Sequence, residues 1–265
     1  MTAGPFASDT DRSLPPEIEG LATSFGAEPI DPAAKARRVA EVFARVAERY
    51  DLMNDLMSLG IHRLWKEAML DWLYPRPHMR VLDLAGGTGD IAFRLLARLE
   101  GRAEIVLCDL SPAMLAIGRD RALDHGWLSE IAWVCGDAEC LPFPDRRFDA
   151  VTIAFGIRNV TRIDRALAEI YRVLVPGGRF LCLEFSRMTT PLLEPLYDAW
   201  SFAVVPLLGR LVAGDEASYR YLVESIRRFP DQESFARLLT RTGFARVSWR
   251  NLSAGIAAIH SGWRL

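Results

Sequence analysis

The sequence predicts an α/β fold whose sheet is mainly parallel. Between about residues 80 and 185, apolar runs of strand length alternate with segments of helical periodicity, as expected for βαβ units. A glycine-rich turn joins the first of these strands to a helix within the stretch 81–93. The last two predicted strands, 244–250 and 256–263, are separated by a short glycine-containing connection, which favours an antiparallel hairpin at the end of the chain.

The composition is that of an ordinary globular protein. A length of 265 residues suits one α/β domain with additions, and a net charge of −2 argues against a general affinity for nucleic acid. The four cysteines and four histidines show no metal-binding spacing, so we expect reduced thiols in a cytoplasmic protein and no bound metal. There is no signal-peptide pattern and no apolar run of membrane-spanning length.

The start of the chain divides into a tail and two helices. Residues 1–32 contain five prolines and no sustained periodicity, which predicts a flexible tail ahead of a single domain at 33–265. Two helices within 33–75 precede the first strand, and they either pack in the core or cover the ligand-binding turn. Their periodic apolar residues are Val39, Val42, Phe43, Val46 and Tyr50, followed by Leu64, Trp65, Ala68, Met69 and Trp72.

The turn within 81–93 predicts a nucleotide site. Gly86, Gly87 and Gly89 lie between a strand and a helix, where a ligand can approach the backbone and the helix N-terminus. Residues 87–92 also fit the dinucleotide fingerprint G-x-G-x-x-G/A. Three interpretations are therefore open: an NAD site, an S-adenosylmethionine (SAM) site, or a tight turn without a ligand.

Two carboxylates near the turn argue against NAD. Asp83 lies inside the predicted strand, where a carboxylate is unfavourable unless it orders the turn or faces a cationic ligand. Asp90 would place negative charge where a pyrophosphate approaches the helix N-terminus.

Polar residues follow the next strands, where ligands bind in open α/β sheets. Asp109 ends the strand 104–108 and is placed to accept hydrogen bonds from both ribose hydroxyls; an exposed turn aspartate is the alternative. Asp137 follows the strand 131–135, where a purine amino group would be read, although a capping role competes. Arg158 and Asn159 follow the fourth strand, at the same edge of the sheet, and a salt bridge is the competing role for Arg158.

The α/β alternation continues to residue 185 and then stops. A helix at 161–174 and the Pro176-Gly177-Gly178 turn lead into a strand at 179–185. The insertion 187–230 contains an apolar region at 192–212 that is too interrupted to span a bilayer. It suits an apolar substrate pocket, a surface resting on a membrane, or simple packing. A helix at 231–241 precedes the terminal hairpin.

An ordered set of motifs resembles the ubiquinone/menaquinone biosynthesis C-methyltransferase family, a group of class I SAM-dependent methyltransferases. The resemblance covers roughly residues 40 to 265, and the whole set is far more specific than the glycine turn alone. The motifs are Val-Phe-Ala-Arg-Val-Ala-Glu-Arg-Tyr-Asp-Leu-Met-Asn-Asp (42–55), His-Arg-Leu-Trp-Lys (62–66), Asp-Leu-Ala-Gly-Gly-Thr-Gly-Asp (83–90), Leu-Pro-Phe-Pro-Asp (141–145), Phe-Gly-Ile-Arg-Asn-Val (155–160), Pro-Gly-Gly-Arg (176–179), Leu-Glu-Phe-Ser (183–186) and Ser-Tyr-Arg-Tyr-Leu-x-Glu-Ser-Ile-Arg (218–227).

The resemblance implies a Rossmann-like methyltransferase sheet with a C-terminal hairpin, covered by N-terminal and inserted helices, and SAM as cofactor. The implied cofactor contacts are Thr88 in the turn, Asp109 at the ribose, and Asp137 with Ala138 near the adenine; the position of the glycine turn itself adds Asp83 and Gly86 as candidates. The chain departs from the family at Ala154, where relatives often carry a serine, so a hydroxyl contact to SAM is absent.

The implied reaction is methylation of a ring carbon on a polyprenylated benzoquinol or naphthoquinol, and the sequence does not decide between the two. We expect Arg158 and Asn159 to orient the quinol oxygen and Tyr50 to bound the ring. Arg158 would favour the phenolate or organise a water, since an arginine side chain stays protonated at neutral pH and cannot act as the base. Expected partners are the inner membrane surface at its cytoplasmic side, other quinone-biosynthesis enzymes and a second copy of the chain. The competing functions are a non-catalytic SAM-binding scaffold and an NAD-dependent oxidoreductase.

Overall fold

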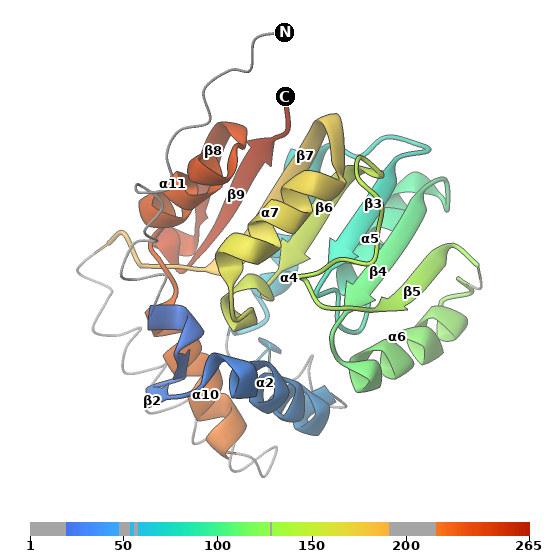
Figure 1. Cartoon of the computed structure of the whole chain (residues 1–265). Helices are drawn as coiled ribbons and strands as arrows, with labels where there is room; N and C mark the ends of the chain where they lie inside the picture. The colour runs from blue at the N-terminus through green and yellow to red at the C-terminus, as the bar shows by residue number, and fades with distance from the viewer. Residues whose placement is uncertain (1–19, 48–53, 56–57, 128, 191–215) are drawn as a thin grey trace, which may run out of the picture.

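One seven-stranded sheet organises the chain, in the order β5-β4-β3-β6-β7-β9-β8 (Figure 1). The computed structural model describes residues 20–47, 54–55, 58–127, 129–190 and 216–265. The strands of this sheet are β3 (Arg80–Leu84), β4 (Glu104–Asp109), β5 (Ile131–Cys135), β6 (Phe148–Ala154), β7 (Leu174–Phe185), β8 (Ala245–Leu252) and β9 (Ala257–Trp263).

The strand directions match the prediction. Strands β3 to β7 pair in parallel, whereas β9 is antiparallel to both β7 and β8. The predicted terminal hairpin is therefore confirmed. Asp83 is paired with Leu107 of β4 and Thr152 of β6, so the carboxyl ends of the central strands lie level with one another.

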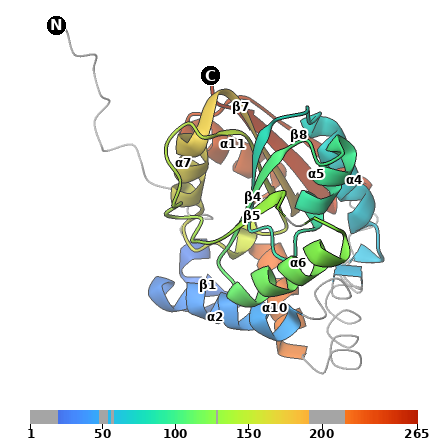
Figure 2. The same cartoon turned by 90° about the vertical axis from the view of Figure 1, so that its right-hand side faces the viewer.

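Helices cover both faces of the sheet (Figure 2). One face is covered by α4 (His62–Leu73), α5 (Asp90–Leu99) and α6 (Pro112–Asp124), and the other by α7 (Ile163–Val173) and α11 (Gln232–Thr242). The strands bury both faces because alternate residues point in opposite directions. Val81 belongs to the cluster with α4 and α5, whereas its neighbour Leu82 belongs to the cluster with α7 and α11.

Local signals set the helix starts. Ser111 is the N-cap of α6, and its hydroxyl accepts a hydrogen bond from the Met114 backbone N–H at 3.4 Å. Pro112 is the first helical residue, as predicted for a proline directly after a cap. Asp231 caps α11 in the same way, accepting from the Ser234 N–H at 2.7 Å.

Two helices from distant parts of the chain lie side by side at the carboxyl ends of the parallel strands (Figures 1 and 2). They are α2 (Pro32–Val46) and α10 (Glu216–Arg228), and together they are called the site cover below. The other predicted N-terminal helix, α4, instead packs on the sheet against β7. Of the two interpretations of the N-terminal helices, covering the site therefore applies to α2, and packing in the core applies to α4.

A short ribbon ties the site cover together. Its strands β1 (Ser24–Phe25) and β2 (Glu28–Pro29) pair antiparallel, and the Phe25 ring stacks on Tyr221 of α10 with centroids 4.1 Å apart. The Ala27 N–H donates to the Glu224 carboxylate at 2.7 Å. The packed structure therefore begins before residue 33, within the segment 1–32 that was predicted to be a flexible tail. Residues 1–19, Tyr50 and the apolar region 192–212 lie outside the described residues.

Candidate functional site

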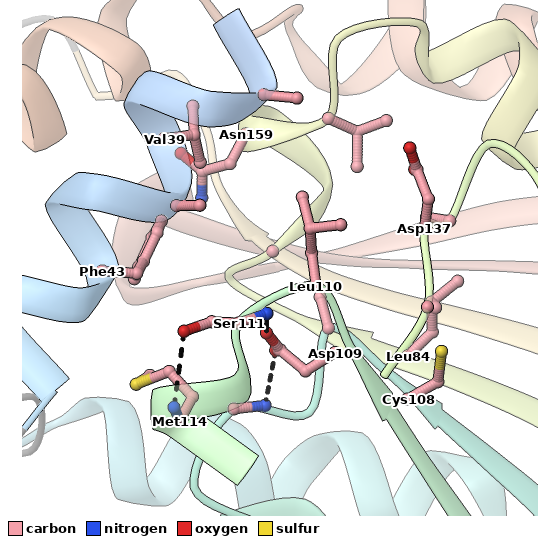
Figure 3. Close-up of a pocket in the computed structure, with 18 of the residues that line it drawn as sticks. Val39, Phe43, Leu84, Cys108, Asp109, Leu110, Ser111, Met114, Asp137 and Asn159 are labelled. Carbon is pink, nitrogen blue, oxygen red and sulfur yellow. Dashed lines mark hydrogen bonds between the residues drawn. The ribbon is translucent and has the colours of Figure 1, made fainter. Parts of the chain in front are cut away.

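A cavity opens at the carboxyl ends of β3, β4, β5 and β6 (Figure 3). Its walls come from the turns after these strands and from helix α2. The lining residues are Ala36, Val39, Ala40, Phe43, Leu84, Ala85, Gly87, Cys108, Asp109, Leu110, Ser111, Met114, Gly136, Asp137, Ala138, Glu139, Phe155, Gly156, Asn159, Val160 and Thr161.

The glycine turn requires glycine for two different reasons. Gly87 and Gly89 have φ values of +57° and +92°, which other residues adopt only with strain. Gly86 has no space for a side chain, because a Cβ there would lie 2.6 Å from Leu107 Cγ and 2.9 Å from Asp83 Oδ2. Gly87 lines the cavity, whereas Gly86 packs between the cavity wall and the sheet.

Asp109 joins the first two turns of the site. Its Oδ2 accepts a hydrogen bond from the Gly87 N–H at 2.9 Å, and its Oδ1 accepts from the Ser111 N–H at 2.8 Å (Figure 3). Burial raises the pKa of Asp109, although these two N–H groups act in the opposite direction. Each oxygen retains further acceptor capacity, so the carboxylate can receive both hydroxyls of a ribose.

The predicted adenine region also lines the cavity. Asp137 Oδ1 accepts from the Glu139 N–H at 2.9 Å, which fixes the turn after β5. Ala138 is buried beside it. The structure therefore brings together Asp109, Asp137 and Ala138 on one cavity wall.

Asp83 and Thr88 lie close to the cavity without lining it. Asp83 is 1% exposed, and its Oδ1 accepts from the Thr152 hydroxyl at 2.9 Å. Its Oδ2 makes no hydrogen bond of normal length and angle. Burial raises the pKa of Asp83 to about 7. Thr88 is buried in the turn, where its hydroxyl accepts from Arg121 at 3.0 Å.

Asp90 orders the start of α5. Its carboxylate pairs with the buried Lys66 of α4 at 2.6 Å and with Arg94 at 2.7 Å. Burial alone would raise the pKa of Asp90, but the two cations hold it below its ordinary value. This carboxylate therefore fixes the helix that follows the glycine turn against α4.

The two consecutive residues Arg158 and Asn159 have different surroundings. They belong to η3 (Ile157–Asn159), the turn after β6. Arg158 is 3% exposed, and its Nη1 lies 2.7 Å from Glu184 Oε1 and 2.6 Å from the Phe155 carbonyl oxygen. Asn159 lines the cavity instead. The salt bridge considered for Arg158 is present, and its role in orienting the quinol stays a prediction.

Several lining residues were not singled out from the sequence. Leu110 is 40% exposed and follows Asp109 directly, and Met114 lies one turn into α6. Position could have identified Leu110, because it comes next after a strand end. No local pattern distinguishes Val39 and Phe43 of α2, since their contact with the cavity depends on how α2 packs on the sheet.

Two negative findings concern the described residues. Among them, no group of three or more histidine, cysteine, aspartate or glutamate side chains is arranged to hold a metal ion. The helices that the structure describes also include none with the length and hydropathy needed to cross a membrane.

Comparison with known proteins gives matches over almost the whole chain. Residues 32–264 match the ubiE/COQ5 methyltransferase family. The ubiquinone/menaquinone biosynthesis C-methyltransferase UbiE of Paracoccus denitrificans is 58% identical over 92% of this chain and 97% of its own length. The protein of that name from Brucella abortus is 54% identical over 93% of this chain and 92% of its own length.

Solved structures share the fold at low sequence identity. The [4+2]-cyclase SpnF has a TM-score of 0.64 at 18% identity, covering 86% of this chain and 96% of its own. A SAM-dependent methyltransferase from Aquifex aeolicus has a TM-score of 0.55 at 16% identity, covering 76% of this chain and 89% of its own. The predicted methyltransferase-like sheet is therefore confirmed.

The buried Asp83 predicts a pH-dependent stability. The folded state keeps Asp83 protonated up to a pH of about 7, whereas an aspartate in the unfolded chain ionises near pH 4. The contribution of protonated Asp83 to the free energy of unfolding is therefore complete below pH 4 and is lost as the pH rises to about 7. Asp83→Asn should therefore gain up to about 4 kcal/mol of unfolding free energy relative to the unsubstituted chain between pH 4 and 8. Chemical denaturation across this range measures the difference. Asp124→Asn, at an exposed carboxylate, is the control, and parallel pH profiles for all three proteins would contradict the prediction.

The Arg158–Glu184 pair predicts a large effect of one neutral substitution. Glu184→Gln leaves a buried guanidinium without its counter-charge and should lower the free energy of unfolding by about 3 to 5 kcal/mol. Urea denaturation measures the loss. Glu233→Gln removes the same charge from an exposed pair with Arg237 and should cost under about 1 kcal/mol. Equal costs at the two sites would refute this assignment.

Proposed function

The chain belongs to the ubiE/COQ5 methyltransferase family, and we propose that it transfers the methyl group of SAM to a ring carbon of a polyprenylated quinol in ubiquinone or menaquinone biosynthesis. The observation that carries this proposal is the family match over residues 32–264, which includes the glycine turn, Asp109 and both parts of the site cover. SAM is the cofactor of methyltransferases of this fold, among them a nematode phosphoethanolamine N-methyltransferase solved with SAM.

The cavity residues fit SAM. Asp109 retains acceptor capacity for the two ribose hydroxyls after its two backbone hydrogen bonds. Leu110 and Met114 supply apolar surface for a purine, and Asp137 supplies a carboxylate for its amino group. Asp83 has a pKa raised by burial to about 7, so a cationic sulfonium near the glycine turn would favour its ionised form, whereas the Asp90 carboxylate is already paired with Lys66 and Arg94. Bound SAM supplies an electrophilic methyl group.

The chain itself orients the acceptor and excludes water. A ring carbon ortho to a phenolate is nucleophilic, whereas that of the neutral phenol is much less so. Asn159 lines the cavity and its buried Nδ2 has no hydrogen-bond partner in the part of the chain that the structure describes, so it can donate to the quinol oxygen. Val39 and Phe43 of α2 form an apolar wall for the ring. Holding carbon and methyl in line contributes several kcal/mol of rate enhancement.

Arg158 acts in this proposal by fixing the turn that carries Asn159. Its guanidinium is engaged by Glu184 and by the Phe155 carbonyl oxygen, and no atom of Arg158 lines the cavity. An arginine side chain also stays protonated at neutral pH, so it cannot accept the quinol proton. Tyr50, which lies outside the described residues, stays a candidate to bound the ring.

Binding and transfer assays test the function. The unsubstituted chain should bind SAM but not NAD and should transfer a labelled methyl group from SAM to a demethylated benzoquinol, naphthoquinol or both. Asp109→Ala should raise the Kd for SAM by about tenfold or more, because two ribose hydrogen bonds are lost. Asp145→Ala, at an exposed carboxylate on the opposite side of the fold, is the matched control.

The outcomes separate the competing functions. Binding of SAM without transfer to either quinol would favour a scaffold that only binds the cofactor. Binding of NAD in place of SAM would favour an oxidoreductase. Transfer to one quinol alone would name the acceptor.

We further propose a cytoplasmic enzyme that rests on the inner membrane, where a polyprenylated substrate resides. The support is the apolar composition of residues 192–212, including Trp200 and Phe202.

The full chain should float with liposomes, and replacing Trp200 and Phe202 by serine should reduce the bound fraction severalfold. Leu123→Ser, at an exposed apolar side chain of α6, is the control. Equal flotation of all three proteins, or none at all, would contradict membrane binding. Association with other quinone-biosynthesis enzymes and a homodimer are part of the same proposal.

A further inference from the structure

Helix α10 contacts both residues of the turn after β6. Tyr221 donates its hydroxyl hydrogen to Asn159 Oδ1 at 3.0 Å. Ser225, one helical turn later on α10, accepts from Arg158 Nε at 3.4 Å. Two residues four apart on one helix face therefore hold two consecutive residues of η3.

The hydroxyl of Tyr221 decides which way the Asn159 amide faces. A buried hydroxyl needs an acceptor for its hydrogen, and Asn159 Oδ1 is the one that its hydrogen bond reaches. If the amide were rotated by a half-turn, Nδ2 could donate to the Tyr221 oxygen, but the hydroxyl hydrogen would then lack an acceptor and Asn159 Oδ1 would lose its donor. The observed orientation leaves Nδ2, which is buried and has no hydrogen-bond partner among the described residues, as the donor available beside the cavity that Asn159 lines.

We infer that Tyr221 is a positioning residue for methyl transfer: its hydroxyl holds the Asn159 amide so that Nδ2 donates to the oxygen of the bound quinol. This inference rests on the proposed function, since it names how that site recognises its acceptor. Tyr221 does not line the cavity, so it acts through Asn159.

The surroundings of Tyr221 suit this role. Its side chain is 4% exposed and its ring stacks on Phe25. The Arg38 guanidinium of α2 lies 4.1 Å from the centroid of the same Phe25 ring. Burial raises the pKa of Tyr221, so its hydroxyl remains a neutral donor across the physiological range. The ribbon, α2 and α10 thus hold the Tyr221 ring on one side while its hydroxyl reaches the site on the other.

The orientation matters because an amide is both donor and acceptor. With Nδ2 toward the cavity, Asn159 stabilises negative charge on the quinol oxygen, the state in which the ring carbon is nucleophilic. With Oδ1 toward the cavity, the same side chain would favour the protonated, unreactive quinol. The hydroxyl therefore selects between two amide orientations with opposite effects on the acceptor.

Tyr221→Phe tests the inference because it keeps the ring and its stacking on Phe25 and removes only the hydroxyl. We expect kcat for methyl transfer to fall by about 10- to 100-fold, with the Kd for SAM changed less than about twofold. Tyr171→Phe is the matched control, since Tyr171 lies on α7, its ring packs against Phe244, and its hydroxyl makes no hydrogen bond in the described structure. That control should keep full activity.

A double-mutant cycle distinguishes positioning from a general loss of structure. In an Asn159→Ala background, Tyr221→Phe should cause little further loss of kcat, because its target is gone. Additive losses would show that Tyr221 acts elsewhere and would overturn the inference, as would full activity of Tyr221→Phe.

A binding measurement separates this inference from the proposed function. Tyr221→Phe should weaken binding of a naphthol probe severalfold while leaving binding of the matching naphthalene, which lacks the oxygen, unchanged. Equal effects on both probes would overturn the inference even where methyl transfer by the unsubstituted chain is established. Failure of the unsubstituted chain to methylate any quinol would instead overturn the proposed function.

Discussion

The carboxylate of Asp109 is the contact on which the site geometry depends. It accepts from the backbone of Gly87 after β3 and of Ser111 before α6, so one side chain holds two turns in register. Both turns begin at level strand ends because β3 and β4 pair in parallel without a shift. The hydroxyls of a ribose would then complete the hydrogen bonding of a carboxylate that the backbone has already oriented. The ligand therefore meets a preformed acceptor.

Much of this arrangement was predictable because it is local in sequence. Strand ends, the glycine turn and the capped start at Ser111 follow from periodicity and from residue preferences over a few positions. The identity of the cofactor did not follow from these local signals, because a strand-end Asp109 at a ribose fits NAD and SAM alike; it followed from the resemblance of the whole motif set. The environment of Arg158 was not predictable. Its partners, Glu184 and Ser225, are 26 and 67 residues away, and a motif alone does not distinguish a buried ion pair from a cavity wall.

The buried ionisable side chains near the strand ends are of two kinds, those paired with an opposite charge and one that is not. Two ion pairs are formed within the protein, Arg158 with Glu184 and Lys66 with Asp90. Because these charges already have partners, the entry of a ligand adds little to the free-energy cost of burying them. Asp83 differs, because it lacks a cationic partner at salt-bridge distance among the described residues and burial holds its pKa to about 7. A cationic ligand near the glycine turn would favour its ionised form. The paired charges thus set the shape of the site, while the unpaired one responds to its occupant.

The sheet and the site cover contribute different parts of the function. The sheet is shared with proteins at 16–18% identity, one of them a cyclase, so the sheet alone does not determine the reaction. The proposed acceptor region instead combines η3 with α2 and α10, which come from opposite ends of the chain. Phe25 of β1 links the two helices, because its ring stacks on Tyr221 of α10 and lies under the Arg38 guanidinium of α2; Phe25 and Tyr221 are 196 residues apart in sequence (221 − 25). Substitutions in the site cover can therefore change which acceptor is aligned without altering the cofactor turns beneath it.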